Sequence, residues 1–143
     1  RTFSKAYGMA GLRIGLAFGH PDLLVGLRTV KDSYNVNRLS LAAGEAALED
    51  MTAVAANVDR VRATRATLTT GLERLGFHVL PSETNFVLAR RRDVDQAPVA
   101  RALAERGILV RHFAVPALED ALRITVGTDD EVTALLTSLA DVV

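Results

Sequence analysis

Apolar residues recur at helical spacing along much of this chain, and the longest such stripe predicts a helix over residues 53–75. Six residues separated by steps of three, four and seven form the stripe: Val54, Val58, Val61, Leu68, Leu72 and Leu75. Gly76 follows at once, and glycine readily adopts the left-handed conformation that ends helices. We therefore expect the helix to stop there and to bury one side.

Shorter helices are expected elsewhere. They are predicted from Pro21 onward, over residues 39–49, over residues 94–106 and after Thr128. Thr128 precedes Glu131 by three positions, the spacing of a capping box in which each residue satisfies a backbone amide of the other. Gly107 is expected to end the helix over residues 94–106.

Short apolar runs between the helices predict strands. Residues 13–19 form one such run, bounded by glycines, and are interpreted as a buried strand. Further strands are predicted over 77–80, 85–89, 108–111 and 122–126. In the last of these, Leu122, Ile124 and Val126 alternate with Arg123 and Thr125, so one face is apolar and the other polar.

The order of elements predicts two domains. From about residue 51 it runs helix, strand, strand, helix, strand, strand, helix, which is typical of a compact α/β or α+β layer over 51–143. Residues 1–50 resemble the tail of another domain, because the strand over 13–19 has no sheet partner and a lone buried strand is not stable. The absence of an initial Met also suggests part of a longer protein.

Composition excludes several classes of function. The 143 residues include 17 basic and 17 acidic side chains, so the chain lacks the positive charge of a general nucleic-acid binder. It has no Cys, which excludes disulfides, thiolate metal sites and thiol catalysis. Its three His residues share no metal spacing. No apolar run is long enough to span a membrane, and the default compartment is the cytoplasm.

The first residues carry the candidate chemistry. Thr2, Ser4, Lys5 and Arg13 place two hydroxyls, a primary amine and a guanidinium within twelve positions, with two glycines between amine and guanidinium. Hydroxyls and arginine bind phosphate, and a lysine amine condenses with an aldehyde. Pyridoxal phosphate carries both groups, so this segment is a candidate cofactor site. The alternative is that Lys5 is an ordinary surface cation.

Three motifs add a family resemblance. They are Ser4-Lys5-Ala6-Tyr7-Gly8 with Ala10-Gly11-Leu12-Arg13-Ile14-Gly15, then Lys31-Asp32-Ser33-Tyr34-Asn35-Val36-Asn37, and Leu122-Arg123-Ile124-Thr125-Val126-Gly127-Thr128. In this order they resemble the fold-type I pyridoxal-phosphate aminotransferases, and most closely the histidinol-phosphate aminotransferase subfamily. The resemblance covers the whole chain. It implies that 1–50 is the end of the large cofactor-binding domain and 51–143 the small α/β domain.

The resemblance also implies roles near the cofactor. Lys5 would bind pyridoxal 5'-phosphate covalently, and its amine, once released, would act as general base and acid. Thr2, Ser4 and Arg13 match positions that bind the cofactor phosphate.

Two further arginines are implied to bind the substrate. Arg123 matches the arginine that binds the α-carboxylate of glutamate and oxoglutarate, and Arg111 matches one that helps to hold the substrate phosphate. Two guanidinium groups suit an anionic substrate. Each could instead be a solvated surface cation.

The implied reaction is amino transfer from histidinol phosphate to 2-oxoglutarate in histidine biosynthesis. The family's remaining cofactor ligands precede the lysine, so the 143 residues alone are expected to be inactive, and the full protein is expected to be a homodimer. One alternative is an aromatic amino-acid aminotransferase of the same subfamily. A phosphothreonine-type decarboxylase shares the fold but usually departs from the lysine motif. A third alternative is a non-catalytic remnant or interaction domain.

Overall fold

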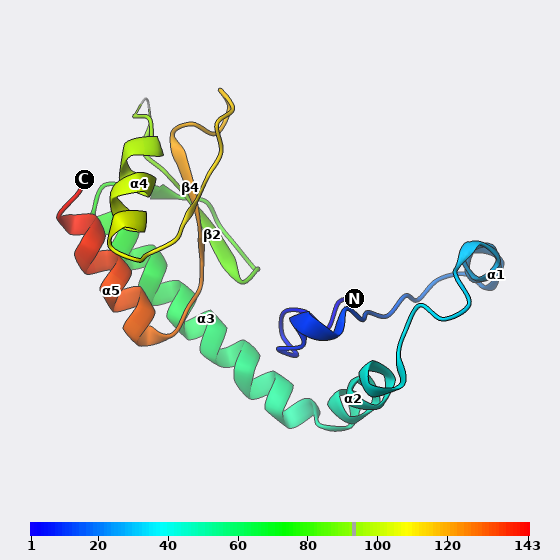
Figure 1. Ribbon diagram of the computed structural model, residues 1–143. Coiled ribbons are helices and arrows are strands. Elements are labelled where there is room, and N and C mark those ends of the chain that lie inside the picture. The colour runs from blue at the N-terminus through cyan, green and yellow to red at the C-terminus, as the bar shows by residue number, and fades with distance from the viewer. Residues whose placement is uncertain (93) are drawn as a thin grey trace. The chain divides into compact units, whose positions relative to one another are not determined.

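The computed structural model describes residues 1–92 and 94–143 (Figure 1). Contacts between Cα atoms divide the chain into two compact units, Arg1–Val58 and Asp59–Val143. The division falls inside the helix α3 (Met51–Arg74). The assignment of residues 1–50 and 51–143 to the domains of a larger enzyme stays a prediction.

The second unit is an antiparallel sheet with helices on one face, α3, α4 and α5 (Figure 1). Its strands lie in the order β1-β2-β4-β3 and have these bounds: β1 (His78–Val79), β2 (Phe86–Arg90), β3 (Arg111–His112) and β4 (Ala121–Thr125). The covering helices are α3, α4 (Ala97–Glu105) and α5 (Asp129–Ala140). The predicted order of helices and strands after residue 51 is confirmed.

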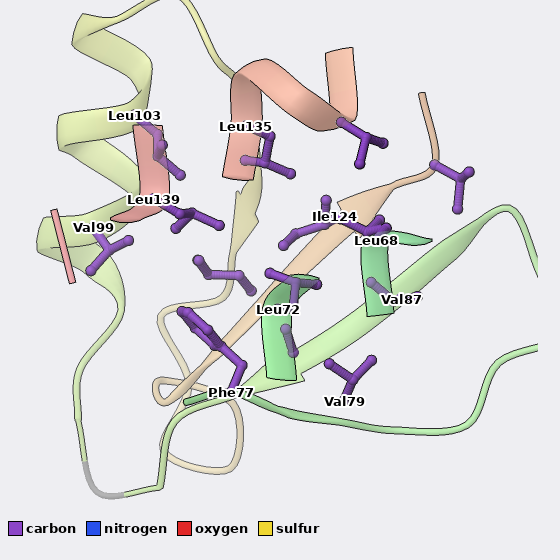
Figure 2. Close-up of a cluster of buried hydrophobic side chains, with 14 residues drawn as sticks. Leu68, Leu72, Phe77, Val79, Val87, Val99, Leu103, Ile124, Leu135 and Leu139 are labelled. Atoms are coloured by element: carbon purple, nitrogen blue, oxygen red, sulfur yellow. The ribbon is translucent and has the colours of Figure 1, made fainter. Parts of the chain in front are cut away.

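One hydrophobic core joins the sheet to its three helices (Figure 2). Fully buried leucines come from each helix: Leu68 and Leu72 of α3, Leu103 of α4 and Leu139 of α5. Val87, Leu122 and Ile124 meet them from the central strands. The alternation predicted for β4 is confirmed, because Arg123 and Thr125 are exposed on the opposite face. The sheet face opposite the core therefore carries the polar side chains of β4.

Glycine ends two of the helices, as predicted. Gly76 and Gly107 have positive φ values of 83° and 78°. The residue after each glycine donates its amide to a carbonyl five positions back, Phe77 to Leu72 and Ile108 to Leu103. This is the Schellman arrangement, which satisfies carbonyls that the helix leaves unpaired. The capping box at Thr128 and Glu131 is also present at the start of α5.

The first unit consists of a folded-back segment and helices. The elements are the single 3₁₀ turn η1 (Ala10–Leu12), α1 (Pro21–Val30), α2 (Arg38–Glu49) and the first two turns of α3. The helices predicted from Pro21 and over 39–49 are confirmed. No residue of α1 is buried. No helix among the described residues is both long enough and apolar enough to cross a membrane.

The buried strand predicted over 13–19 is wrong. The run makes a single bridge, from Thr2 to Gly15, and the Phe18 side chain is 83% exposed. An apolar run becomes a strand only where a sheet edge offers it partners. Among the described residues this segment has only residues 1–3 to pair with.

Two other elements, α4 and β3, have bounds that differ from those predicted. The helix expected from residue 94 begins at Ala97, because Pro98 lacks an amide proton and is tolerated only in the first turn. The strand expected over 108–111 is instead β3, Arg111–His112, since only these residues pair with Arg123 and Leu122 of β4.

Candidate functional site

The first sixteen residues fold back on themselves and bring the predicted cofactor ligands together. Amide hydrogen bonds join Phe3 to Ile14 over 3.2 Å and Leu16 to Arg1 over 2.7 Å. The return of the chain places Arg13 Nη1 3.4 Å from Ser4 Oγ. Thr2 Oγ1 accepts the Ser4 amide at 3.1 Å. Thr2, Ser4 and Arg13 therefore form one polar cluster.

Arg13 has an unusual backbone conformation. Its φ of 52° and ψ of 43° are left-handed, and among the described residues it is the sole non-glycine with positive φ. Such a conformation costs on the order of 1–2 kcal/mol for an L-residue. Its Nη1 also donates to the Ala10 carbonyl at 2.9 Å, which fixes the guanidinium beside the loop. Strain of this kind tends to persist where a side chain has a function.

Lys5 lies on a tight loop in the same segment. The Gly8 amide donates to the Lys5 carbonyl at 2.8 Å, and the Met9 amide donates to the Phe3 carbonyl at 3.0 Å. Gly8 has a φ of 68°, which an L side chain would adopt only with strain. The Lys5 residue is exposed, and no described hydrogen bond or ion pair engages its amine. The amine is accessible to a ligand.

Two polar residues that sequence reasoning missed hold this loop against the helices. Ser40 of α2 is 1% exposed and donates to the Leu12 carbonyl at 3.1 Å. Asn57 of α3 donates from Nδ2 to the Ala6 carbonyl at 2.9 Å. The sequence feature that could have identified them is their position, since each is a polar residue on a helix among small or apolar neighbours.

An open groove of about 510 Å³ lies beside the Lys5 loop. Small residues of α2 and α3 form most of its wall, with Ala6, Tyr7 and Met9 from the loop. Tyr7 packs against the buried Phe3, with ring centroids 4.5 Å apart and the ring planes tilted by 39°. The groove is mainly apolar, so a group bound there would meet mainly apolar side chains rather than charged ones.

The two arginines predicted to bind substrate form a cluster within the second unit. Arg111 of β3 and Arg123 of β4 are direct cross-strand partners, so both side chains project from the same face of the sheet. Phe113 lies close to both, with its ring centroid 5.4 Å from Arg111 Cζ and 5.8 Å from Arg123 Cζ. The Phe86 ring is also 5.4 Å from Arg123 Cζ. Sequence reasoning assigned no role to either phenylalanine.

Neither guanidinium of this pair is neutralised within residues 1–92 and 94–143. None of the described ion pairs includes Arg111 or Arg123. Like charges placed directly opposite each other destabilise a sheet. A bound anion would remove that repulsion, and two guanidinium forks can bind it through several hydrogen bonds. This arrangement is suited to a carboxylate or a phosphate group.

The predicted site residues thus form two groups. Thr2, Ser4, Lys5 and Arg13 belong to the unit Arg1–Val58, whereas Arg111 and Arg123 belong to Asp59–Val143. Within each unit the residues that were predicted to act together do lie together. Among the residues that the structure describes, no group of three or more His, Asp or Glu side chains could hold a metal ion.

Comparison with known proteins gives this geometry a context. Residues 1–139 match the family described as aminotransferase class I and II. A histidinol-phosphate aminotransferase of Gluconacetobacter diazotrophicus is 48% identical over 145 residues, a match that covers 99% of this chain and 41% of that protein. The chain therefore spans about two fifths of the length of this curated relative.

Solved structures give a similar result. The histidinol-phosphate aminotransferase of Sinorhizobium meliloti, solved in complex with pyridoxal-5'-phosphate, is 32% identical with a TM-score of 0.89; the match covers 99% of this chain and 39% of that one. The L-threonine-O-3-phosphate decarboxylase of Porphyromonas gingivalis is 27% identical with a TM-score of 0.83, covering 98% and 44%. These matches confirm the predicted fold, that of the fold-type I transferases, over about two fifths of the length of the matched chains.

Proposed function

We infer, since this chain belongs to the class I and II aminotransferase family, that it forms part of a pyridoxal-phosphate-dependent aminotransferase. The proposed reaction moves an amino group from histidinol phosphate to 2-oxoglutarate, a step of histidine biosynthesis. The observation that carries the proposal is the cross-strand pair of Arg111 and Arg123, whose guanidiniums have no ion-pair partner among residues 1–92 and 94–143. The name of the Gluconacetobacter relative supports the choice of amino donor.

Both proposed substrates are small anions, which is what the arginine pair can bind. Arg123 is proposed to bind the α-carboxylate of glutamate and of 2-oxoglutarate, and Arg111 the phosphate of histidinol phosphate. A guanidinium binds carboxylate and phosphate oxygens in a planar fork, whereas a lysine acts as a point charge. Because the two side chains are cross-strand partners, one anion could also contact both.

The residues of the first unit fit pyridoxal phosphate by their donor set. The Thr2 and Ser4 hydroxyls and the Arg13 guanidinium are proposed to hold its phosphate, and Arg13 Nη1 already lies 3.4 Å from Ser4 Oγ. The accessible Lys5 amine is proposed to hold its aldehyde carbon. When bound, the cofactor supplies an electron sink for the electrons left on the substrate carbon.

Lys5 is also the proposed proton carrier. Once the amino donor has displaced it from the cofactor, its Nζ would take the proton from the carbon that carries the donor's amino group and pass it to the cofactor carbon that had held Lys5. In the second half of the reaction the same two transfers would run in reverse, so one amine serves first as base and then as acid. The hydrogen bonds from Ser40 and Asn57 would keep the Lys5 loop in place during these transfers.

The whole protein is proposed to be a homodimer that acts in the cytoplasm. The chain spans 41% of the Gluconacetobacter relative, so we propose that these 143 residues do not transaminate by themselves.

The test is steady-state kinetics on the natural, full-length protein. We expect glutamate to form from histidinol phosphate and 2-oxoglutarate, and Lys5→Ala to abolish this and to prevent a phosphopyridoxyl adduct after borohydride reduction. Faster turnover of phenylalanine or tyrosine would instead support the aromatic aminotransferase. Release of carbon dioxide from O-phosphothreonine would support the decarboxylase. No reaction and no adduct would support the non-catalytic alternative.

A further inference from the structure

A single aromatic ring lies close to two like charges. The Phe113 ring is within 6 Å of the Cζ atoms of both Arg111 and Arg123. The face of an aromatic ring carries negative potential and attracts a guanidinium. Each arginine is attracted to the ring while the two arginines repel each other. The ring is therefore placed to offset the repulsion that the cross-strand pairing creates.

The backbone fixes the position of this ring. Phe113 follows Arg111 by two residues, so the extended chain directs both side chains to the same face. His112, between them, lies on the other face, where its Nε2 is 3.1 Å from the Glu119 carbonyl oxygen. Beyond the strand, the Val115 amide donates to the Phe113 carbonyl at 2.8 Å. The contact of His112 before Phe113 and the turn after it thus fix the backbone that carries the half-buried ring.

Arg123 has a second aromatic neighbour in addition to Phe113. Phe86 of β2 is 5.4 Å from Arg123 Cζ, and among the described residues no other ring accompanies Arg111. Among the described residues, Phe113 is the one ring that lies near both arginines. Its removal should release Arg111 most, because an exposed arginine that loses its ring can turn its guanidinium into solvent, away from Arg123.

We propose that Phe113 is a positioning residue that keeps the guanidiniums of Arg111 and Arg123 side by side and so raises the affinity of this pair for a doubly charged anion. The inference rests on the proposed function only in taking these arginines as anion ligands. It predicts that the ring matters more for phosphate groups than for single carboxylates, because a dianion gains most from two adjacent positive charges.

The test compares phosphate binding in the full-length protein and three variants, by calorimetry with pyridoxal phosphate in excess so that the cofactor phosphate site stays filled. Phe113→Leu removes the ring and keeps an apolar side chain. Phe113→Tyr keeps the ring. Phe18→Leu is the matched control, because that phenylalanine is 83% exposed and lies in the other unit.

We expect Phe113→Leu to weaken inorganic phosphate binding about fivefold to tenfold, the loss of one or two cation–π contacts at an exposed site. Phe113→Tyr and Phe18→Leu should bind phosphate within about twofold of the natural protein. In kinetics, Phe113→Leu should raise the KM for histidinol phosphate and leave kcat nearly unchanged, whereas a variant that merely misfolds loses kcat and melting temperature.

Three results would overturn the inference: no phosphate binding by the natural protein, natural binding by Phe113→Leu, or failure of Phe113→Tyr to bind as the natural protein does. Failure of the proposed function looks different. A natural protein that binds phosphate through the ring-dependent arginines but does not transaminate would contradict the aminotransferase proposal and support the role of Phe113.

Discussion

Arg90 and Asp120 form a bidentate ion pair at the end of the sheet that carries Arg111 and Arg123. Nη2 of Arg90 lies 2.8 Å from Oδ1 and 3.0 Å from Oδ2 of Asp120, and Nε is within 3.2 Å of both oxygens. Asp120 is 13% exposed at its side chain. The pair secures the segment that enters β4, so it fixes one end of the loop between Arg111 and Arg123.

Asp120→Asn should therefore destabilise the fold measurably. Breaking a buried ion pair costs about 3–5 kcal/mol, and we expect about 1–2 kcal/mol here because 38% of the Arg90 side chain is exposed. The measurement is the free energy of unfolding in urea. Asp141→Asn is the matched control, since Asp141 pairs with Arg106 but is 63% exposed, and it should cost less than about 0.5 kcal/mol. Equal losses for both variants would contradict the importance of burial.

The capping box of α5 gives a second prediction. Thr128 Oγ1 accepts the Glu131 amide at 3.3 Å, and the Glu131 carboxylate accepts the Thr128 amide at 2.7 Å. Thr128→Ala removes one of these bonds and should lower the free energy of unfolding by about 1 kcal/mol. Thr137→Ala, in the exposed interior of the same helix, should be neutral or slightly stabilising because alanine is the better helix former. A thermal melt of each variant distinguishes the two effects.

The hydrophobic core gives a third prediction, about the cost of shortening a buried side chain. Leu72 of α3 has no exposed surface, whereas Leu109 is 84% exposed. Leu72→Ala leaves a cavity at the centre of the cluster in Figure 2 and should cost about 2–5 kcal/mol. Leu109→Ala should change the free energy of unfolding by less than about 0.5 kcal/mol. Urea denaturation measures both, and a small loss for Leu72→Ala would mean that the cluster repacks around the cavity.

Arg13 allows strain and ligand binding to be separated. Arg13→Gly accepts the positive φ of 52° without strain, so the free energy of unfolding should not fall. The same change removes a proposed phosphate ligand, and the affinity for pyridoxal phosphate should fall about tenfold to a hundredfold.

A dissociation constant from the cofactor's absorbance measures the second effect in the full-length protein. A control is Arg28→Gly, for which we expect the reverse pattern: unchanged cofactor affinity and a loss of about 1 kcal/mol, because Arg28 lies within α1 and glycine weakens a helix. Loss of stability without loss of affinity in Arg13→Gly would remove Arg13 from the proposed cofactor site.

Local sequence signals predicted the second unit well. The stripe of α3, the glycines after α3 and α4, the capping box of α5 and the alternation in β4 all depend on residues close in sequence, and each is confirmed. The run over 13–19 failed because a strand depends on partners that no local pattern reveals. The ends of β3 depend in the same way on its register with β4.

The candidate site was predictable in its charges but not in its surroundings. Lys5, Arg13, Arg111 and Arg123 stand out by chemistry and by motif, although their roles stay predictions. The contacts of Phe113 with both arginines follow from a cross-strand register across an eight-residue connection, 113–120, which sequence spacing does not determine. The support of the Lys5 loop by Asn57 likewise joins residues 51 positions apart.

The register of β3 with β4 also bears on how this sheet can evolve. Arg111 and Arg123 are held opposite each other by strand pairing, while the connection between them is tied to the sheet at its end by Arg90 and Asp120. Insertions or deletions near residues 114–117 would then lengthen or shorten an outer loop and leave the two guanidiniums opposed. Descendants of this gene could acquire a new loop, and with it a new selectivity, while inheriting the same arginine pair.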